Sequence, residues 1–158
     1  KVRLLRVPGA NPVKQSKWHR AAGELLGLEI RDYYGASFIG NLVAWRRENV
    51  LKLHRHIEQT TGKDWLTAVC GHWDLSEYIL YGVFVEFVLG ESSGHYFDDA
   101  VHCLGYWRNE PLDDEGLREF LKGLRDDHVA VMISSKAGIP AEKYMRFLDE
   151  SSGKQIIS

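Results

Sequence analysis

The feature that most constrains the fold is an apolar stretch over residues 78–89, which is long enough for a helix of about three turns. Its apolar side chains lie on nearly every side of such a helix: Ile79, Leu80, Val83, Phe84, Val85, Phe87 and Val88. A helix that is apolar all round belongs in the interior of a domain. We therefore predict a central helix that is capped by Asp74 or Ser76 and ends at Leu89, before Gly90.

Local signals predict five further helices around this one, because apolar residues recur at helical spacing between capping residues and glycines. The first runs from an N-cap at Ser16 to Gly27, the second covers residues 47–61, and the third runs from Asp64 to about Gly71. The fourth follows a cap at Asp113 or Asp114, and the fifth follows Pro140. Strands are expected over residues 37–43, irregularly within 95–107, and over 129–133. The last of these is a continuous apolar run, as in buried parallel strands.

The alternation of helices with fewer strands predicts an α/β fold, helix-rich, with an incomplete sheet of few strands. We expect a single domain over residues 1–150 and a flexible polar tail over residues 151–158. The chain opens with a strand-like run over residues 1–7 and has no initiating Met. We interpret this opening as the middle of a longer polypeptide.

Composition excludes several classes of protein. The chain has 158 residues and a formal net charge of -2, so no basic excess favours nucleic-acid binding. Its two cysteines, Cys70 and Cys103, form neither a disulfide framework nor a zinc pattern. No run approaches the roughly 18 apolar residues of a transmembrane helix, and no signal peptide opens the chain. A cytoplasmic protein without a transmembrane segment is expected.

The start of the predicted central helix is the strongest candidate for a functional site. Glu77 stands in its first turn, where a carboxylate could act as a general base or bind an acceptor hydroxyl. Aromatic side chains beside it would suit sugar rings. The expected substrate-binding residues are Trp73, Asp74, Ser76, Tyr78 and Tyr81. A purely structural explanation is open too, because Asp74 and Glu77 have the spacing of a capping box.

A second candidate site lies among the histidines that follow. His102 precedes Gly105, which would allow a ligand to approach the backbone closely. With His95, Asp98 and Asp99, it could form a cluster that binds a divalent ion. A structural role for each histidine is the alternative. The sequence has no glycine-rich phosphate loop, no nucleophile elbow and no Asp-x-Asp motif.

The order of these motifs resembles a known family. The relevant residues are Trp18-His19, Leu25-Leu26, the aromatic segment 33–45 before an amphipathic helix, Asp64-Trp65, the run from Ser76 to Tyr81, and residues 129–135. Together they resemble the C-terminal half of an uncharacterised bacterial family described as glycosyltransferases with a nucleotide-diphospho-sugar transferase (GT-A-like) fold. The Ser-Glu-Tyr-x-Leu-Tyr run is the most specific part.

The resemblance implies an enzyme that moves a sugar from a nucleotide donor to a carbohydrate-type acceptor. Glu77 would match the acidic residue at the acceptor-side helix. His102 would match a histidine that completes a Mn²⁺ or Mg²⁺ site in retaining members, although the Lys-Pro pair of that motif is missing here. The nucleotide and the Asp-x-Asp belong to the N-terminal half of such enzymes, so this chain alone is expected to be inactive.

Three hypotheses follow from the sequence. The first is the acceptor-side portion of a glycosyltransferase, with Glu77 as the catalytic residue. The second is a non-catalytic binding or scaffold domain, favoured by the missing phosphate-binding motifs. The third, weaker hypothesis is a metal-dependent hydrolase that uses His95, Asp98, Asp99 and His102.

Overall fold

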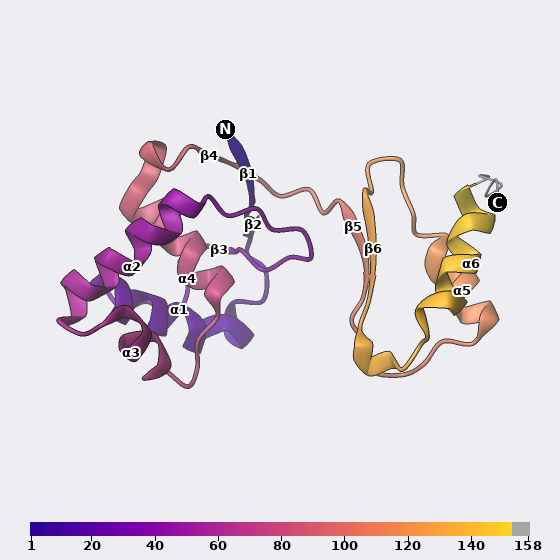
Figure 1. The fold of residues 1–158 in the computed structure, drawn as a ribbon, viewed down its shortest axis with the longest axis horizontal. Coiled ribbons are helices and arrows are strands. Elements are labelled where there is room, and N and C mark those ends of the chain that lie inside the picture. Colours follow the sequence, from indigo (N-terminus) through magenta and orange to yellow (C-terminus); the bar gives the residue numbers. More distant parts are fainter. Residues whose placement is uncertain (153–158) are drawn as a thin grey trace. The chain divides into compact units, whose positions relative to one another are not determined.

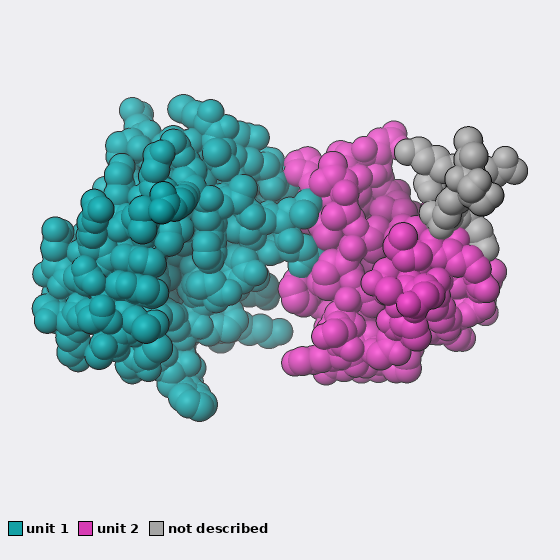
Figure 2. Space-filling model, in the orientation of Figure 1, with its two compact units in different colours: residues 1–100 teal, residues 101–158 magenta. Residues whose placement is uncertain are grey.

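The computed structural model describes residues 1–152, with side chains described up to residue 148. Within this part the fold is mixed α/β, with six α-helices, a few short strands and about 49% helix. This confirms the predicted α/β class and its excess of helix. Where one domain over residues 1–150 was predicted, the chain forms two compact units, residues 1–100 and residues 101–158 (Figure 2). Residues 153–158 of the predicted flexible tail lie outside the described residues.

Unit 1 contains most of the helices and strands (Figure 1). Its strands are β1 (Val2–Leu5), β2 (Val7–Pro8), β3 (Ala36–Ser37) and β4 (His95–Asp98). Its α-helices are α1 (Pro12–Leu26), α2 (Arg47–Thr61), α3 (Trp65–Cys70) and α4 (Glu77–Val83). Strand β1 pairs in parallel with β4, with Val2 opposite His95, and β2 pairs antiparallel with β3. The two ends of unit 1 are therefore joined in one small sheet.

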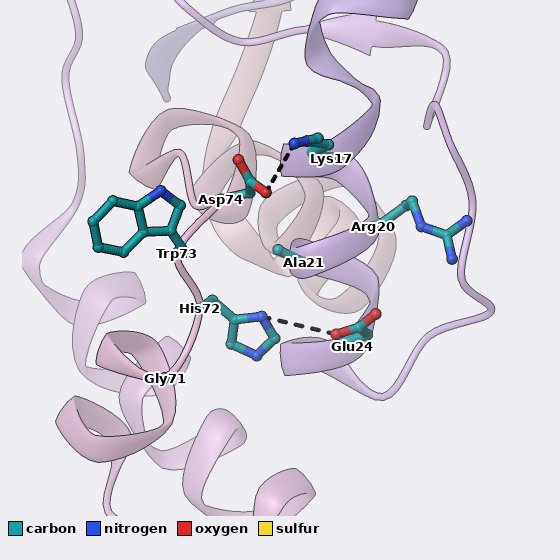
Figure 3. Close-up of a pocket in the computed structure, with 8 residues that line it drawn as sticks. All are labelled: Lys17, Arg20, Ala21, Glu24, Gly71, His72, Trp73 and Asp74. Atoms are coloured by element: carbon teal, nitrogen blue, oxygen red, sulfur yellow. Dashed lines mark ion pairs between the residues drawn. The ribbon is translucent and has the colours of Figure 1, made fainter.

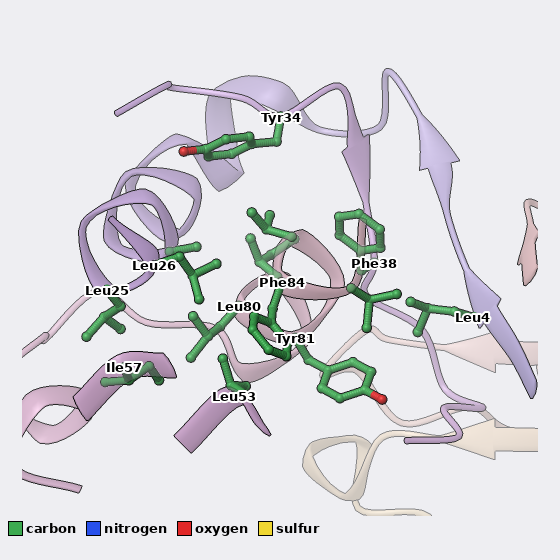
Figure 4. Close-up of a cluster of buried hydrophobic side chains, with 14 of the residues drawn as sticks. Leu4, Leu25, Leu26, Tyr34, Phe38, Leu53, Ile57, Leu80, Tyr81 and Phe84 are labelled. Carbon is green, nitrogen blue, oxygen red and sulfur yellow. The ribbon is translucent and has the colours of Figure 1, made fainter. Parts of the chain in front are cut away.

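The predicted central helix forms the middle of the unit 1 core. Helix α4 continues without a break into a π-helical segment, Phe84–Leu89, and Gly90 ends it with φ 54°. Seven consecutive residues, 79–85, are buried. Leucines of α1 and α2 and the Phe38 ring surround them (Figure 4). Gly82 allows the Phe38 ring to lie directly on the helix backbone, because a Cβ at this position would overlap the ring.

Several predicted ends of helices are confirmed by their caps. Asp64 accepts hydrogen bonds from the amides of Leu66 and Thr67, at 3.1 and 3.2 Å. Gly27 and Gly62 end their helices with φ 63° and 67°, which a glycine adopts without strain. Helix α2 has the predicted bounds.

Two local predictions in unit 1 were wrong. Ser16 does not cap α1, because the helix begins a turn earlier at Pro12, and Asn11 precedes it in the left-handed region with φ 51°. Pro12 suits a first helical position because it has no amide hydrogen to satisfy. The strand predicted over residues 37–43 is reduced to β3, Ala36–Ser37. After it, Phe38 turns into the core and is 1% exposed, so the segment packs by its side chains rather than by a strand ladder.

Unit 2 is a smaller α/β unit. Its elements are β5 (Cys103–Tyr106), α5 (Asp114–Leu121), β6 (Ala130–Ile133), a short 3-10 helix (Ser135–Ala137) and α6 (Ala141–Ser152). Strands β5 and β6 pair in parallel, as the apolar run over residues 129–133 predicted. The predicted burial was wrong, because β6 is half-buried and Val129, just before it, is 79% exposed. Asp113 caps α5 by accepting from the Gly116 amide at 2.8 Å. In the described part of the chain, no helix is both long and apolar enough to cross a bilayer.

Candidate functional site

The segment that connects α3 to α4 carries most of the predicted site residues. Ser76 is the N-cap residue of α4, but its side chain makes no capping hydrogen bond. Asp74 does not cap the helix either, because its carboxylate lies 3.3 Å from the Lys17 ammonium. The capping box that could have explained Asp74 and Glu77 therefore does not form, because Ser76 holds the N-cap position and Asp74 pairs with Lys17.

The first part of this segment lines a polar pocket with a volume of about 270 Å³. The pocket is bounded by successive turns of α1 and by the four residues that follow α3. Its lining residues are Lys17, Arg20, Ala21, Glu24, Gly71, His72, Trp73 and Asp74. Figure 3 shows that Lys17 faces Asp74 across it, and that His72 faces Glu24. The nitrogen-to-oxygen distances are 3.3 and 3.8 Å, so each pair places a donor opposite an acceptor.

Trp73 stands at the edge of the polar pocket with its indole ring directed away from the other lining residues (Figure 3). The side chain is 99% exposed. An indole ring exposes a large apolar area to water, and a tryptophan that packs on nothing gains no stability from it. The indole is therefore accessible to a ligand at the edge of the pocket.

The second part of the segment lines a different, mostly apolar pocket of about 130 Å³, called here the aromatic pocket. Its walls come from α2, α3, α4 and the residues around them: Trp45, Val50, Leu53, His54, Ile57, Trp65, Val69, Leu75, Glu77, Leu80 and Tyr81. Leu53, Ile57, Leu80 and Tyr81 also belong to the unit 1 core, so the floor of this pocket is the core itself (Figure 4).

Two stacked ring pairs shape the aromatic pocket. The indole of Trp45 stacks on Tyr81, with ring centroids 5.0 Å apart and an angle of 23°. The His54 imidazole stacks on the Trp65 indole at 3.8 Å and 2°. Tyr78 meets Trp45 edge-on at 5.9 Å, outside the pocket lining. Each pair holds one indole ring in a fixed orientation.

Tyr81 is fixed at its hydroxyl as well. It accepts a hydrogen bond from the Arg46 amide at 3.0 Å and lies 2.8 Å from His95 Nε2. His95 Nδ1 lies 3.0 Å from the Val2 carbonyl, an acceptor, so Nδ1 carries the proton and Tyr81 donates to Nε2. Burial lowers the pKa of His95, which favours this neutral form. His95 thus anchors the aromatic pocket to β1.

The structure divides the predicted site between the two pockets. Trp73 and Asp74 line the polar pocket, whereas Glu77 and Tyr81 line the aromatic one. Ser76 lies between these two pairs in the sequence and is buried. Its carbonyl accepts a hydrogen bond from the Leu80 amide. Glu77 is exposed in the first turn of α4. The predicted residues are thus spread over both linings, and Ser76 and Tyr78 belong to neither.

His102 was predicted as a metal ligand. Its Nδ1 lies 3.0 Å from the Asp127 carbonyl and 3.5 Å from the Asp127 carboxylate, in unit 2. Within the described residues, His, Cys, Asp and Glu side chains nowhere gather in a group of three or more suited to a metal ion. Asp98 pairs with Arg3 at 2.6 Å, and His95 anchors Tyr81. His95 and Asp98, two members of the cluster in the hydrolase hypothesis, thus each have a structural partner in unit 1.

Some pocket residues escaped the sequence analysis. Lys17, Arg20 and Glu24 lie on one face of α1, and their spacing of three and four residues places them together once the helix is known. No sequence signal links them to Trp73. Trp45, His54 and Trp65 reach the aromatic pocket from separate elements, and only tertiary packing brings them together.

Comparison with known proteins places these pockets within a family. A family model described as a family of unknown function (DUF6492) matches residues 8–109, and the chain belongs to this family. The match includes every residue that lines either pocket. No curated protein and no solved structure matches the chain.

Proposed function

We propose that the chain is the acceptor-side part of a glycosyltransferase and that a sugar ring of the acceptor stacks on Trp73. The observation that carries the proposal is the fully exposed indole at the edge of the polar pocket. The apolar C–H face of a pyranose packs on such a ring, which buries indole area that is otherwise exposed to water. The resemblance of the Ser-Glu-Tyr-x-Leu-Tyr run to glycosyltransferases supports the same class.

The walls of the polar pocket suit the hydroxyl groups of a sugar. Lys17, Arg20 and His72 supply donors, whereas Glu24 and Asp74 supply acceptors. A sugar hydroxyl both donates and accepts, so it can be inserted between members of such pairs. The volume of about 270 Å³ is close to the lower end of ligand pockets, roughly 300–1,000 Å³, and suits a group of monosaccharide size.

Glu77 is the proposed base of the transfer. It is exposed at the first turn of α4, so its carboxylate can reach an acceptor hydroxyl that lies outside the core. In this proposal the nucleotide sugar, with Mn²⁺ or Mg²⁺, is held by residues other than those of the two pockets. His102 is the residue that the resemblance assigns to the metal.

A second candidate function is a carbohydrate-binding domain without transfer chemistry. It is favoured by the division of the site, because Glu77 and Trp73 line different pockets. Both candidates require sugar binding at Trp73, and they differ in whether the protein also binds a nucleotide sugar.

Calorimetry can test both candidates. The chain would be titrated with maltose, cellobiose and chitobiose, and separately with UDP-glucose and GDP-mannose in the presence of Mn²⁺. We expect binding of at least one disaccharide, lost in Trp73→Ala and kept in Trp107→Ala, a matched control because Trp107 is 66% exposed in unit 2.

The outcomes separate the candidates. Metal-dependent binding of a nucleotide sugar supports the transferase, and Glu77→Gln should then suppress transfer while disaccharide binding persists. Disaccharide binding with no response to either nucleotide sugar is compatible with both candidates, because the nucleotide belongs to the N-terminal half of the proposed transferase. If the Trp73→Ala variant binds disaccharides as tightly as the wild type, neither the transferase nor the carbohydrate-binding candidate keeps its basis.

A further inference from the structure

The lining of the aromatic pocket matches one class of ligand. Three large aromatic side chains, Trp45, Trp65 and Tyr81, contribute to it, and the remaining walls are mostly aliphatic. Glu77 is its one acidic residue, and among the described residues that line it there is no Lys or Arg. The pocket is therefore apolar in surface and negative in charge.

The aromatic rings add to this negative character. The face of an aromatic ring carries partial negative charge and attracts cations that lie over it. One face of Trp65 is covered by His54, and one face of Trp45 by Tyr81. Tyr78 meets Trp45 edge-on, so a cation would contact the parts of both indoles that line the cavity. Because both stacked pairs line the cavity, these rings need no rearrangement to contact a ligand.

The ligand must also tolerate an apolar environment. A metal ion or a primary ammonium group would lose most of its hydration in a cavity that offers one carboxylate. A trimethylammonium group differs because its charge is surrounded by methyl groups, which aromatic and aliphatic walls can cover. The volume of about 130 Å³ leaves room for a group of this size and excludes an extended molecule. We infer that the aromatic pocket binds a small organic cation of the trimethylammonium class.

The pocket is organised in advance for this role. Tyr81 is held by the Arg46 amide and by His95, and it is among the most deeply buried side chains of the core. Glu77 lies one turn before Tyr81 on the same helix, so the acidic residue and the ring lie on one face of α4. Ordering these groups costs little on binding, which favours affinity.

This inference does not rest on the proposed function. It concerns the aromatic pocket, whereas sugar binding depends on Trp73 and the polar pocket. The two proposals share Glu77, which is the carboxylate beside the cation here and the base of the transfer there. Loss of sugar binding would leave the cation site untouched, and the reverse also holds.

The test compares choline with its neutral isostere, 3,3-dimethylbutan-1-ol, by calorimetry and by quenching of tryptophan fluorescence at pH 7 and low salt. We expect choline to bind about tenfold more tightly than the alcohol or better, because ring faces and the carboxylate both favour the charge. Glu77→Gln should reduce this preference, and Glu77→Asp should keep part of it. Trp107→Ala, in unit 2, should bind choline like the wild type.

Four results would overturn the inference: no saturable binding of choline, equal binding of the two compounds, an unchanged preference in a folded Glu77→Gln protein, or loss of choline binding in Trp107→Ala. Circular dichroism establishes that each variant is folded. Since Glu77 is exposed, its substitution leaves the core intact.

Discussion

The segment over residues 71–81 contributes to both pockets, but the two pockets are built in opposite ways. The aromatic pocket has core residues for its floor and two stacked ring pairs for its walls. The polar pocket lies on the outer face of α1, and its walls are charged side chains that pair loosely across it. The first pocket is a continuation of the core, and the second is attached to its surface.

This difference implies different responses to mutation. Changes around the aromatic pocket should lower the free energy of unfolding together with any binding, because the same contacts serve both. Changes in the polar pocket should affect binding alone, since exposed side chains contribute little to stability. The predictions below test this separation, beginning with the largest expected loss of stability.

Gly82→Val should have the largest effect. Its Cβ would overlap the buried Phe38 ring, which has to move within a close-packed core. We expect a loss of about 3 kcal/mol in the free energy of unfolding, measured by urea denaturation. Combining it with Phe38→Leu should recover part of that loss, because the smaller side chain leaves room. An additive double variant would show that the overlap is relieved in another way.

The helices around Gly82 show which parts of the fold could be predicted from the sequence. The apolar character of residues 79–85 is local, so the central helix could be predicted, as could the ends of helices with Asp64, Asp113, Gly27 and Gly62. Capping and periodicity depend on neighbours within a few residues. The pairing of β1 with β4 depends on contacts between the two ends of unit 1 and leaves no local signal.

The candidate site was predictable to a lesser degree. The Trp73–Asp74 and Glu77–Tyr81 pairs were found because they are close in sequence, and for the same reason they were assigned to a single site. Their separation arises because α1 packs beside the first pair, whereas α2 and α3 pack beside the second. Only tertiary packing decides which residues face each other across a pocket.

Acidification should destabilise unit 1 through His19, on the inner face of the helix that lines the polar pocket. The side chain is fully buried, and burial lowers its pKa from 6.5 to about 4. Between these values the unfolded chain takes up a proton that the folded chain does not, so stability falls as the pH decreases. At about 1.4 kcal/mol per pH unit, the loss from pH 7 to pH 5 is about 2 kcal/mol.

Urea denaturation at both pH values, with His19→Gln as the comparison, checks this prediction. The variant should lose less stability on acidification, although His95, whose pKa burial also lowers, contributes in the same direction. Parallel losses in both proteins would contradict a neutral buried His19. Sugar binding at pH 5 should remain in the folded fraction, because the outer face of α1 carries the pocket.

Tyr81→Phe should cost about 1.5 kcal/mol and disturb the aromatic pocket alone. The substitution keeps the ring but removes the hydroxyl, which leaves the Arg46 amide and His95 Nε2 without this partner. Urea denaturation measures the loss, and calorimetry with choline should show weaker binding because the ring is less firmly held. Disaccharide binding that weakens to the same extent would show that the two pockets are coupled after all.

Trp73→Ala should have the smallest effect on stability and the largest on sugar binding. With 99% of its side chain exposed, the indole packs on nothing in the folded protein, so its removal should change the free energy of unfolding by less than about 0.5 kcal/mol. The comparison with Gly82→Val therefore spans the range from the unit 1 core to the exposed edge of the polar pocket. A loss of stability above about 1 kcal/mol in Trp73→Ala would mean that the indole supports the fold, since exposed side chains rarely contribute that much. The exposed ring would then no longer point to a ligand.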